Sequence, residues 1–196
     1  MSKSYNFFAY MARMKFIRRW GLMKSVTEEN IAEHSAQVAQ IAHALALIRN
    51  KMFGGSLNAD RIATMALYHE TSEVMTGDLP TPIKYYNDEI KRSYKDIEHT
   101  ANERLIAMLP EEFRADYREI IEIEQGSDEQ VLIKAADKLS AYIKCVEELN
   151  SGNREFAMAE RMLKKELDKY RALPEVAWFC DKYLDTFSRT LDELNG

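Results

Sequence analysis

The sequence has little glycine, proline or cysteine: 7 Gly, 4 Pro and 2 Cys in 196 residues. Few connections can therefore use the special backbone angles that glycine and proline supply. The abundant Ala, Leu, Met, Glu and Lys are good helix formers, so we expect an all-α protein with almost no sheet. Cys145 and Cys180 lie in separate apolar stretches and form no CxxC pair. They predict buried thiols in a reducing cytoplasm and not a disulfide.

The sequence also lacks a long hydrophobic run, an export signal and an excess of positive charge. With 27 basic and 32 acidic residues its formal net charge is -5, which gives no basic surface for DNA or RNA. No stretch approaches the roughly 20 apolar residues that a bilayer span requires, and the first 20 residues contain no small-residue cleavage site. We expect a cytoplasmic protein with neither a nucleic-acid polymer nor a membrane as partner.

Hydrophobic periodicity predicts a bundle of about seven to nine helices. The apolar content of 46% is enough for one sizeable core, so we expect residues 1–196 to form a single domain. Overlapping N-cap signals at Ser25 to Glu28 and at Asn30 precede the second predicted helix, and Asn58 and Ser127 are predicted N-caps of two later helices. The predicted helices cover residues 4–18, 31–52, 59–74, 87–108, 111–124, 128–150, 154–172 and 175–194.

Four residues far apart in the sequence form a candidate metal site. His34, His69, Glu70 and Asp137 offer imidazole nitrogens and carboxylate oxygens, the mixed ligand set that Mn, Fe, Co, Ni or Zn accepts. Each has a plainer interpretation when taken alone. His34 reads as a structural histidine, and Asp137, in the middle of an apolar helix, reads as the ion-pair partner of a neighbouring lysine, Lys134 or Lys138.

The string His69-Glu70-Thr-Ser-Glu73 is close to the HExxH motif of zinc peptidases, but its second histidine is missing. A peptidase would need an unusual ligand, which disfavours that function. If the segment is helical, His69 and Glu73 share one face while Glu70 points about 100° away. The other two histidines, His43 and His99, are read as structural.

Several segments together resemble the HD-domain phosphohydrolases, whose ligands are a His, a His-Asp pair and a distant Asp, all on helices. The resemblance is closest to the bacterial 5'-deoxynucleotidase (YfbR-like) family and spans essentially the whole chain. The segments that carry it are Arg19-Trp20, Ala32-Glu33-His34-Ser35, Tyr68-His69-Glu70-Thr71-Ser72-Glu73-Val74, Gly77-Asp78-Leu79-Pro80-Thr81-Pro82-Ile83-Lys84 and Lys134-Ala135-Ala136-Asp137.

The resemblance implies an HD-type helical bundle that hydrolyses deoxyribonucleoside 5'-monophosphates to deoxyribonucleosides and phosphate, working as a homodimer. It also implies one divalent transition metal (Co, Mn, Zn, Ni, Fe or Cu). The implied ligands are His34, His69, Glu70 and Asp137.

The resemblance further implies a role for individual residues around the metal. Arg19 would clamp the phosphate with its planar fork of donors, and Glu73 would position water or transfer a proton. Trp20 would contact the sugar, and a ring at the place of a 2'-hydroxyl would favour deoxyribose. The remaining implied substrate-binding residues are His34, Asp78, Thr81, Pro82, Ile83 and Lys84.

Without the resemblance, the same residues have ordinary structural interpretations. Trp20 would be a core residue and Arg19 a surface cation. The segment from Asp78 to Lys84 would be a turn with two prolines.

One position departs from the family pattern, because Glu70 stands where the family has aspartate. A glutamate reaches one methylene further, yet we expect it to bind metal; the alternative is weaker binding or a different choice of metal. Two other functions stay open. One is a non-catalytic nucleotide-sensing or scaffold protein, and the other is an HD hydrolase of another phosphomonoester or of a dNTP.

Overall fold

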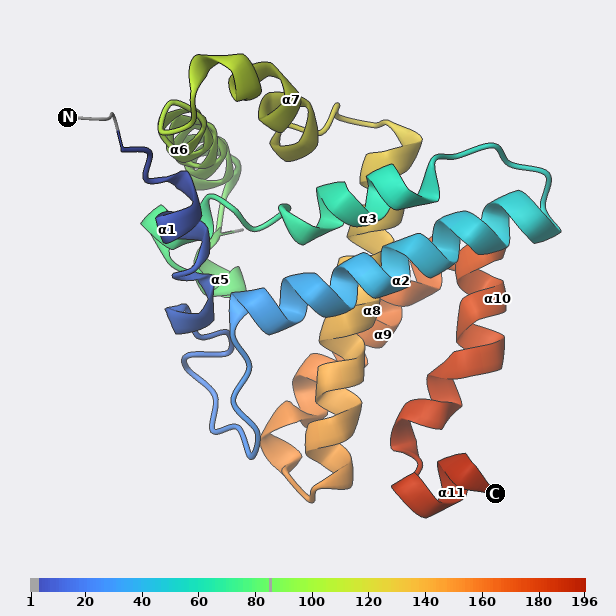
Figure 1. The fold of residues 1–196 in the computed structure, drawn as a ribbon. Coiled ribbons are helices and arrows are strands. Elements are labelled where there is room, and N and C mark those ends of the chain that lie inside the picture. Colours follow the sequence, from blue (N-terminus) through green and yellow to red (C-terminus); the bar gives the residue numbers. More distant parts are fainter. Residues whose placement is uncertain (1–3, 85) are drawn as a thin grey trace.

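The computed structural model describes residues 4–84 and 86–196, with backbone only at residues 81 and 82. Over these residues the protein is all-helical, with one isolated bridge between Arg18 and Asn30 and no strand, as predicted (Figure 1). The helices are α1 (Phe7–Met11), α2 (Ile31–Met52), α3 (Ala59–Leu67), α4 (Glu73–Thr76), α5 (Thr81–Lys84), α6 (Asp88–Ile106), α7 (Glu111–Ile121), α8 (Asp128–Asn150), α9 (Ala157–Tyr170), α10 (Pro174–Tyr183) and α11 (Leu191–Asn195). Short 3-10 helices cover Met14–Phe16, Arg154–Phe156 and Leu184–Ser188.

Helices α2 and α8 cross at the centre of the molecule, and α3, α9 and α10 pack around them (Figure 1). The side chain of Asn30 caps α2 and forms a reciprocal capping box with Glu33, which explains why α2 begins where it was predicted. Both helices bury apolar residues at helical spacing: Val38, Ala42 and Leu45 on α2, and Leu132, Ala136, Leu139 and Ile143 on α8. This main core therefore fixes how the two helices face each other.

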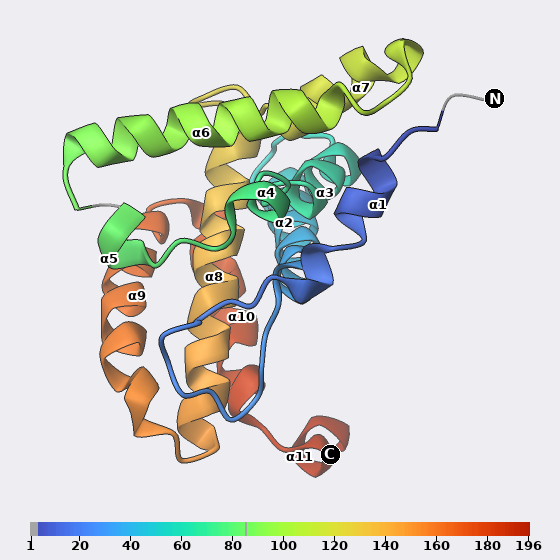
Figure 2. The ribbon, with the colours of Figure 1, turned by 90° about the vertical axis from the view of Figure 1, so that its left-hand side faces the viewer.

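A second apolar cluster lies beside the main core and joins α1 to α6 and α7 (Figure 2). Its buried members are Phe7, Leu105, Ile106, Leu109 and Ile121. Tyr68, Val74 and Met75, from the chain between α3 and α5, pack against it. The second cluster therefore holds the turn that follows α3 in place.

The predicted helix 59–74 is wrong beyond Leu67, because the chain leaves the helix and re-enters it only at Glu73. Side chains of this segment occupy the carbonyls that a continuing helix would use. The His69 Nδ1 lies 2.6 Å from the carbonyl oxygen of Ala66, and the Thr71 hydroxyl donates to the carbonyl of Tyr68 at 2.6 Å. Such local bonds compete with the helical ladder.

Two other predicted helices are also interrupted. The helix 4–18 stops at Met11, and after a 3-10 turn the chain becomes extended at Ile17, where the Ile17 carbonyl accepts the N–H of Ile31. The helix 175–194 ends at Tyr183 and restarts after Thr190, whose side chain caps α11. In the first place a hydrogen bond from a distant residue, and in the second a local cap, overrides a continuous apolar pattern.

The C-terminal apolar stretch is mainly core. Val176, Phe179 and Cys180 of α10 are buried in the main cluster, and Trp178 packs against it. Cys145 of α8 is buried as well, and both cysteines are free thiols, as predicted. Burial raises the pKa of Cys145 to about 12.

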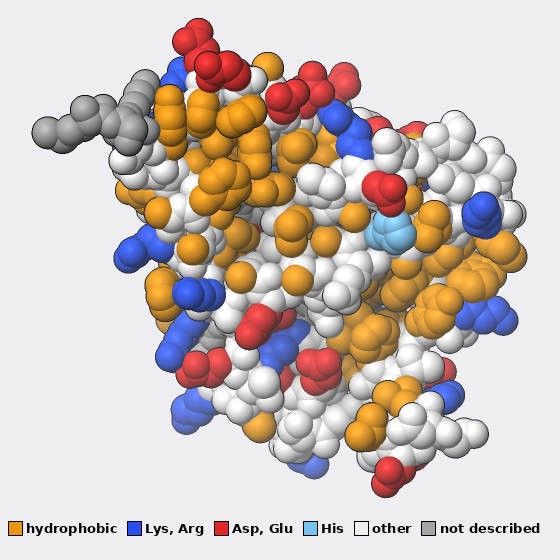
Figure 3. Space-filling view, in the orientation of Figure 1, with side chains coloured by type: hydrophobic (Ala, Val, Ile, Leu, Met, Phe, Trp, Pro, Cys, Tyr) orange, Lys and Arg blue, Asp and Glu red, His pale blue; other side chains and the backbone are white. Residues whose placement is uncertain are grey.

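The described part of the chain carries charged and apolar residues side by side along its helices. None of its helices combines the length and the apolar character needed to cross a bilayer. On the face drawn in Figure 3, acidic, basic and apolar side chains are interspersed, so this face carries no continuous basic surface.

The loop before α2 is anchored to the far end of α8 by Glu148. The buried carboxylate of Glu148 accepts the backbone N–H of Val26 at 2.8 Å and that of Thr27 at 3.0 Å. It also accepts hydrogen bonds from Lys144 at 2.6 Å and Asn153 at 2.7 Å. Burial opposes ionisation, but the bonds from Lys144 and the loop outweigh it and lower the pKa of Glu148 to about 2. The carboxylate is thus a charged anchor for the loop.

We predict that Glu148→Gln lowers the free energy of unfolding by about 3 kcal/mol at pH 7, because a buried, fully bonded charge is lost. A depressed pKa stabilises the fold above the ordinary glutamate pKa of about 4.5, and this stability is lost as pH falls toward 2. The difference in the free energy of unfolding between parent and variant should therefore narrow below pH 4.5. Urea unfolding at pH 7 and at pH 3.5 measures this difference.

Glu147→Gln is the matched control, because Glu147 is the exposed neighbour on the same helix. It should change stability by less than about 0.5 kcal/mol. Equal losses for the two variants would contradict the anchoring role of Glu148.

Candidate metal centre

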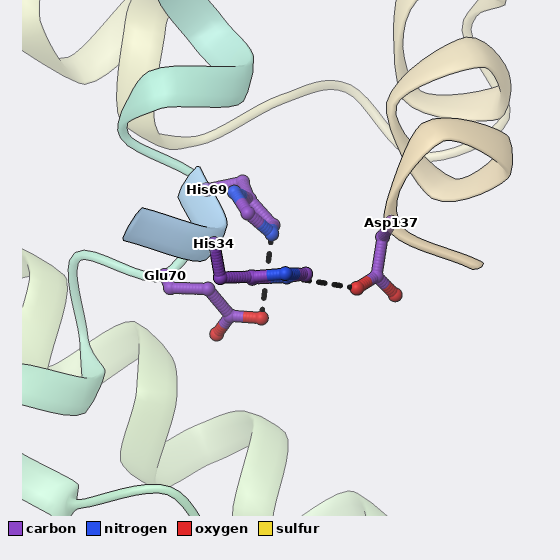
Figure 4. Close-up of side chains that lie close together, drawn as sticks. All are labelled: His34, His69, Glu70 and Asp137. Atoms are coloured by element: carbon purple, nitrogen blue, oxygen red, sulfur yellow. Dashed lines mark ion pairs between the residues drawn. The ribbon is translucent and has the colours of Figure 1, made fainter. Parts of the chain in front are cut away.

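Four side chains from distant parts of the chain converge on one point (Figure 4). His34 comes from α2, Asp137 from α8, and His69 and Glu70 from the turn between α3 and α4. One ligand atom from each residue lies within 4.8 Å of the others. The His34 Nε2 is 3.1 Å from the Asp137 Oδ1, and the His69 Nε2 is 3.4 Å from the Glu70 Oε1. These two consecutive residues project from the turn after α3 and not from a continuous helix.

The two imidazoles are oriented through their Nδ1 atoms. The His69 Nδ1 faces the carbonyl of Ala66, which can only accept, so this nitrogen carries the hydrogen. The His34 Nδ1 is 3.0 Å from the hydroxyl of Ser140, and that hydroxyl donates to the Gln37 side chain at 2.6 Å. The Ser140 oxygen must then accept from His34. Both rings therefore present a lone pair on Nε2 to the centre.

This arrangement fits a divalent transition metal. The Nε2 atoms of His34 and His69 are buried and have no hydrogen-bond partner among the described residues. Buried polar atoms are rarely left unpaired, because losing hydration without a partner is unfavourable. Two such nitrogens beside two carboxylates make an N2O2 donor set for Zn, Fe, Mn, Co or Ni.

The charges at the centre also suit metal binding. Burial, followed by the nearby Arg19 cation, lowers the pKa of His34 and keeps the ring neutral. Burial opposes ionisation of Asp137 and Glu70, yet in both carboxylates the neighbouring groups outweigh it. The groups around the two carboxylates, among them the Lys138 and Arg19 cations beside Asp137, bring the pKa of Asp137 well below its usual value and lower that of Glu70. Neutral imidazoles and ionised carboxylates are the forms that bind metals.

Glu73 lies next to this cluster without belonging to it. It is the first residue of α4 and is buried, with 4% of its surface exposed. Burial, followed by the adjacent Glu70 carboxylate, raises the pKa of Glu73 to about 10. Glu73 is therefore a carboxyl group beside the ligands. Because it does not belong to the ligand set, it is available for proton transfer.

Arg19 approaches the centre from the loop before α2, and Trp20 follows it in the chain. The Nε of Arg19 is 3.1 Å from the Oε2 of Glu29, and Arg19 is near enough to Asp137 for that carboxylate to raise its pKa. Burial opposes this rise, but Glu29 and the other acids outweigh it. The indole N–H of Trp20 donates to Glu29 at 2.8 Å, and its ring lies 5.3 Å from that of Phe156. Trp20 therefore packs on a buried ring and shares Glu29 with Arg19.

The predicted substrate loop is only partly directed at the centre. The charge of Asp78 interacts with that of Arg19. Lys84, in contrast, forms an ion pair with Glu98 at 2.7 Å and lies 4.6 Å from the centre of the Tyr94 ring. The charge of Lys84 is thus already balanced by Glu98 on α6.

Of the remaining predicted residues of this loop, the structure describes the side chain of Ile83. Ile83 is 50% exposed. The side chains of Thr81 and Pro82 fall outside the described residues. His43 and His99 each face a carboxylate on their own part of the surface, which agrees with their structural interpretation.

Sequence reasoning missed the residues that orient the others. Gln37 follows His34 by three positions, and Ser140 follows Asp137 by three positions. Residues at this spacing share a helix face, so a polar residue there was a usable signal. Glu29 carried no such signal. Its partners, Arg19 and Trp20, are separated from it by a loop and not by a fixed helical spacing.

We predict that Ser140→Ala weakens the binding of Co or Zn by about 10- to 100-fold, because the hydroxyl that fixes the His34 tautomer is lost. Competition with a chromogenic chelator measures the affinity. Ser151→Ala, the same substitution at the exposed end of α8, should leave it unchanged. Unaltered affinity in Ser140→Ala would contradict the orienting role.

We predict that Glu70→Ala loses bound metal while Glu70→Asp keeps it, because the carboxylate and not its exact length supplies the ligand. Metal content after dialysis, measured by elemental analysis, distinguishes the variants. Full metal content in Glu70→Ala would show that Glu70 is no ligand.

Comparisons with known proteins agree with this geometry. Residues 6–187 match the sequence model of the family described as 5'-deoxynucleotidase YfbR-like. The chain is 53% identical to a 5'-deoxynucleotidase of Photobacterium profundum over 196 residues, which cover 100% of each chain.

Two solved structures share the fold. An HD-domain phosphohydrolase from Listeria innocua has a TM-score of 0.82 at 24% identity, covering 93% of this chain and 88% of that one. The cyanophage S-2L HD phosphohydrolase DatZ, bound to dA and one catalytic Zn2+ ion, has a TM-score of 0.68 at 20% identity, covering 97% and 99%.

Proposed function

The chain belongs to the YfbR-like 5'-deoxynucleotidase family, and we propose how its own residues carry out that phosphomonoester hydrolysis. The products are a deoxyribonucleoside and phosphate. The observation that carries the proposal is the convergence of four metal-binding side chains with Arg19 on one side and Glu73 on the other.

His34, His69, Glu70 and Asp137 would hold one divalent metal ion, since they form the one such cluster found among the described residues. When bound, the ion supplies a Lewis acid that withdraws electron density from the phosphate. The zinc in the DatZ structure makes Zn one candidate beside Co, Mn, Ni, Fe and Cu. The two ionised carboxylates and two neutral imidazoles would leave the loaded site with little net charge, which suits a dianionic substrate.

Arg19 binds the phosphate. A guanidinium offers two parallel N–H groups to two phosphate oxygens and neutralises charge that develops as the ester bond breaks. Its surroundings support this, because the acids around Arg19 keep it charged despite its burial.

Glu73 transfers the proton in this reaction. Its carboxyl group is buried beside the ligands, so it can orient an attacking water and later pass a proton to the leaving 5'-oxygen. Trp20, held by Phe156 and Glu29, presents a rigid flat surface to the sugar. A ring in that position disfavours a ribose with its extra hydroxyl.

The alternatives fit less well. A sensing or scaffold protein would have no use for a buried Glu73 beside an intact ligand set. A dNTP would need more cations for its extra phosphates, yet Lys84 is already paired with Glu98. The homodimer stays a prediction from the family resemblance.

We predict that the protein with Co or Mn releases phosphate from dAMP and dTMP and does so at least about tenfold more slowly from AMP. Glu73→Gln should lower kcat by roughly 100-fold or more with little change in KM, because proton transfer is lost and binding is kept. A phosphate-release panel of deoxy and ribo monophosphates across metals measures these effects.

The control is Glu89→Gln, which changes an exposed glutamate on α6 and should leave activity at the parent level. Absence of phosphate release with every divalent metal would overturn the proposed function. Full activity in Glu73→Gln would overturn the role of Glu73 alone.

A further inference from the structure

We propose that Glu29 is a positioning residue that holds the phosphate-binding Arg19 and the sugar-facing Trp20 through one carboxylate oxygen. The inference rests on the proposed function, because it concerns how that substrate is oriented. Glu29 is not one of the candidate metal ligands, and among the described residues it forms no ion pair with one of them. The sequence gave no signal for its role.

The contacts of Glu29 are specific. Its Oε2 atom is 2.8 Å from the indole Nε1 of Trp20 and 3.1 Å from the guanidinium Nε of Arg19. Both charged side chains are well shielded, with 11% of the Glu29 side chain and 14% of the Arg19 side chain exposed. Ion pairs that are shielded in this way hold a geometry better than pairs on the open surface, which are screened by water and salt.

The backbone of Glu29 takes part as well. Its carbonyl accepts the N–H of Arg19 at 2.9 Å, beside the isolated bridge between Arg18 and Asn30. Both the side chain and the main chain of one residue thus hold the pair. The other end of the loop is anchored by Glu148 on α8.

Trp20 is held in an unusual backbone conformation. Its φ of 59° makes it the one non-glycine residue with positive φ in the described part of the chain. The left-handed region is unfavourable for a bulky residue, so the surrounding contacts must hold it there. In an extended chain neighbouring side chains point to opposite sides. With Trp20 left-handed, its side chain and that of Arg19 reach the same oxygen atom.

The two contacts need different properties of Glu29. The guanidinium has five N–H donors, and an ion pair at its Nε edge leaves the terminal nitrogens for phosphate oxygens. Holding this cation in place depends on the negative charge. The indole N–H needs only an oxygen acceptor, which an amide also provides. Gln and Ala at position 29 therefore separate the two effects.

The test measures kcat and KM for dAMP and AMP in the metal-loaded parent, Glu29→Gln and Glu29→Ala. We expect Glu29→Ala to lower kcat/KM for dAMP by roughly 100-fold and the dAMP-to-AMP ratio by roughly tenfold, because both side chains lose their partner. We expect Glu29→Gln to lower kcat/KM by roughly tenfold while the ratio stays within about twofold of the parent.

The matched control is the neighbouring Glu28, whose exposed side chain pairs with the exposed Arg18. Glu28→Ala and Glu28→Gln should leave both kcat/KM and the ratio within about twofold of the parent. A dAMP-to-AMP ratio in Glu29→Ala equal to that of the parent would overturn the proposal, even if overall activity falls, because lost activity alone would then reflect a structural role.

A second measurement does not depend on catalysis. In a Trp178→Phe background Trp20 is the one remaining tryptophan, since the sequence has two. We expect acrylamide to quench its fluorescence more strongly in Glu29→Ala and near the parent level in Glu29→Gln. Unchanged quenching in Glu29→Ala would overturn the contact. If the parent released no phosphate from either nucleotide, the proposed function would fail, while this measurement would still judge the Glu29–Trp20 contact.

Discussion

The site depends on the crossing of α2 and α8. Each helix buries an apolar face in the main core, and this packing leaves little freedom in their relative rotation. At the crossing His34 meets Asp137, 103 residues later in the chain, at 3.1 Å. Ser140 and Gln37 join the same contact one turn further along each helix. Hydrophobic packing thus places a polar cluster that would otherwise be unfavourable to bury.

The remaining ligands depend on a helix that stops. Three residues beyond Ala66, the His69 ring takes over a carbonyl that a longer α3 would have used. The same hydrogen bond that ends the helix also fixes the ring for metal binding. One hydrogen bond therefore sets both the local backbone structure and the orientation of the ligand at this turn. The second apolar cluster packs against the turn from outside.

Much of this could be predicted from sequence. The caps at Asn30, Asn58 and Ser127 form as expected, because capping depends on residues within one turn. The four candidate ligands do meet. The end of α3 was missed although its cause is local, because the apolar spacing continues past Leu67 and does not show that the His69 ring takes the carbonyl of Ala66. The contacts of Glu29 and Lys84 could not be predicted, since Trp20 and Glu98 become their neighbours only in the folded chain.

Because Glu148 anchors the loop, the length of α8 between Asp137 and Glu148 sets where the loop lies relative to the metal centre. Asp137 and Glu148 are eleven residues apart, about three helical turns, so they lie on nearly the same face of one rigid rod. One end of this segment carries a candidate ligand, and the other fixes the loop that bears Arg19 and Trp20. Inserting one residue between them would rotate the loop's anchor by about 100° relative to the ligand. The number of residues between Asp137 and Glu148 is therefore constrained more tightly than the identity of the residues between them.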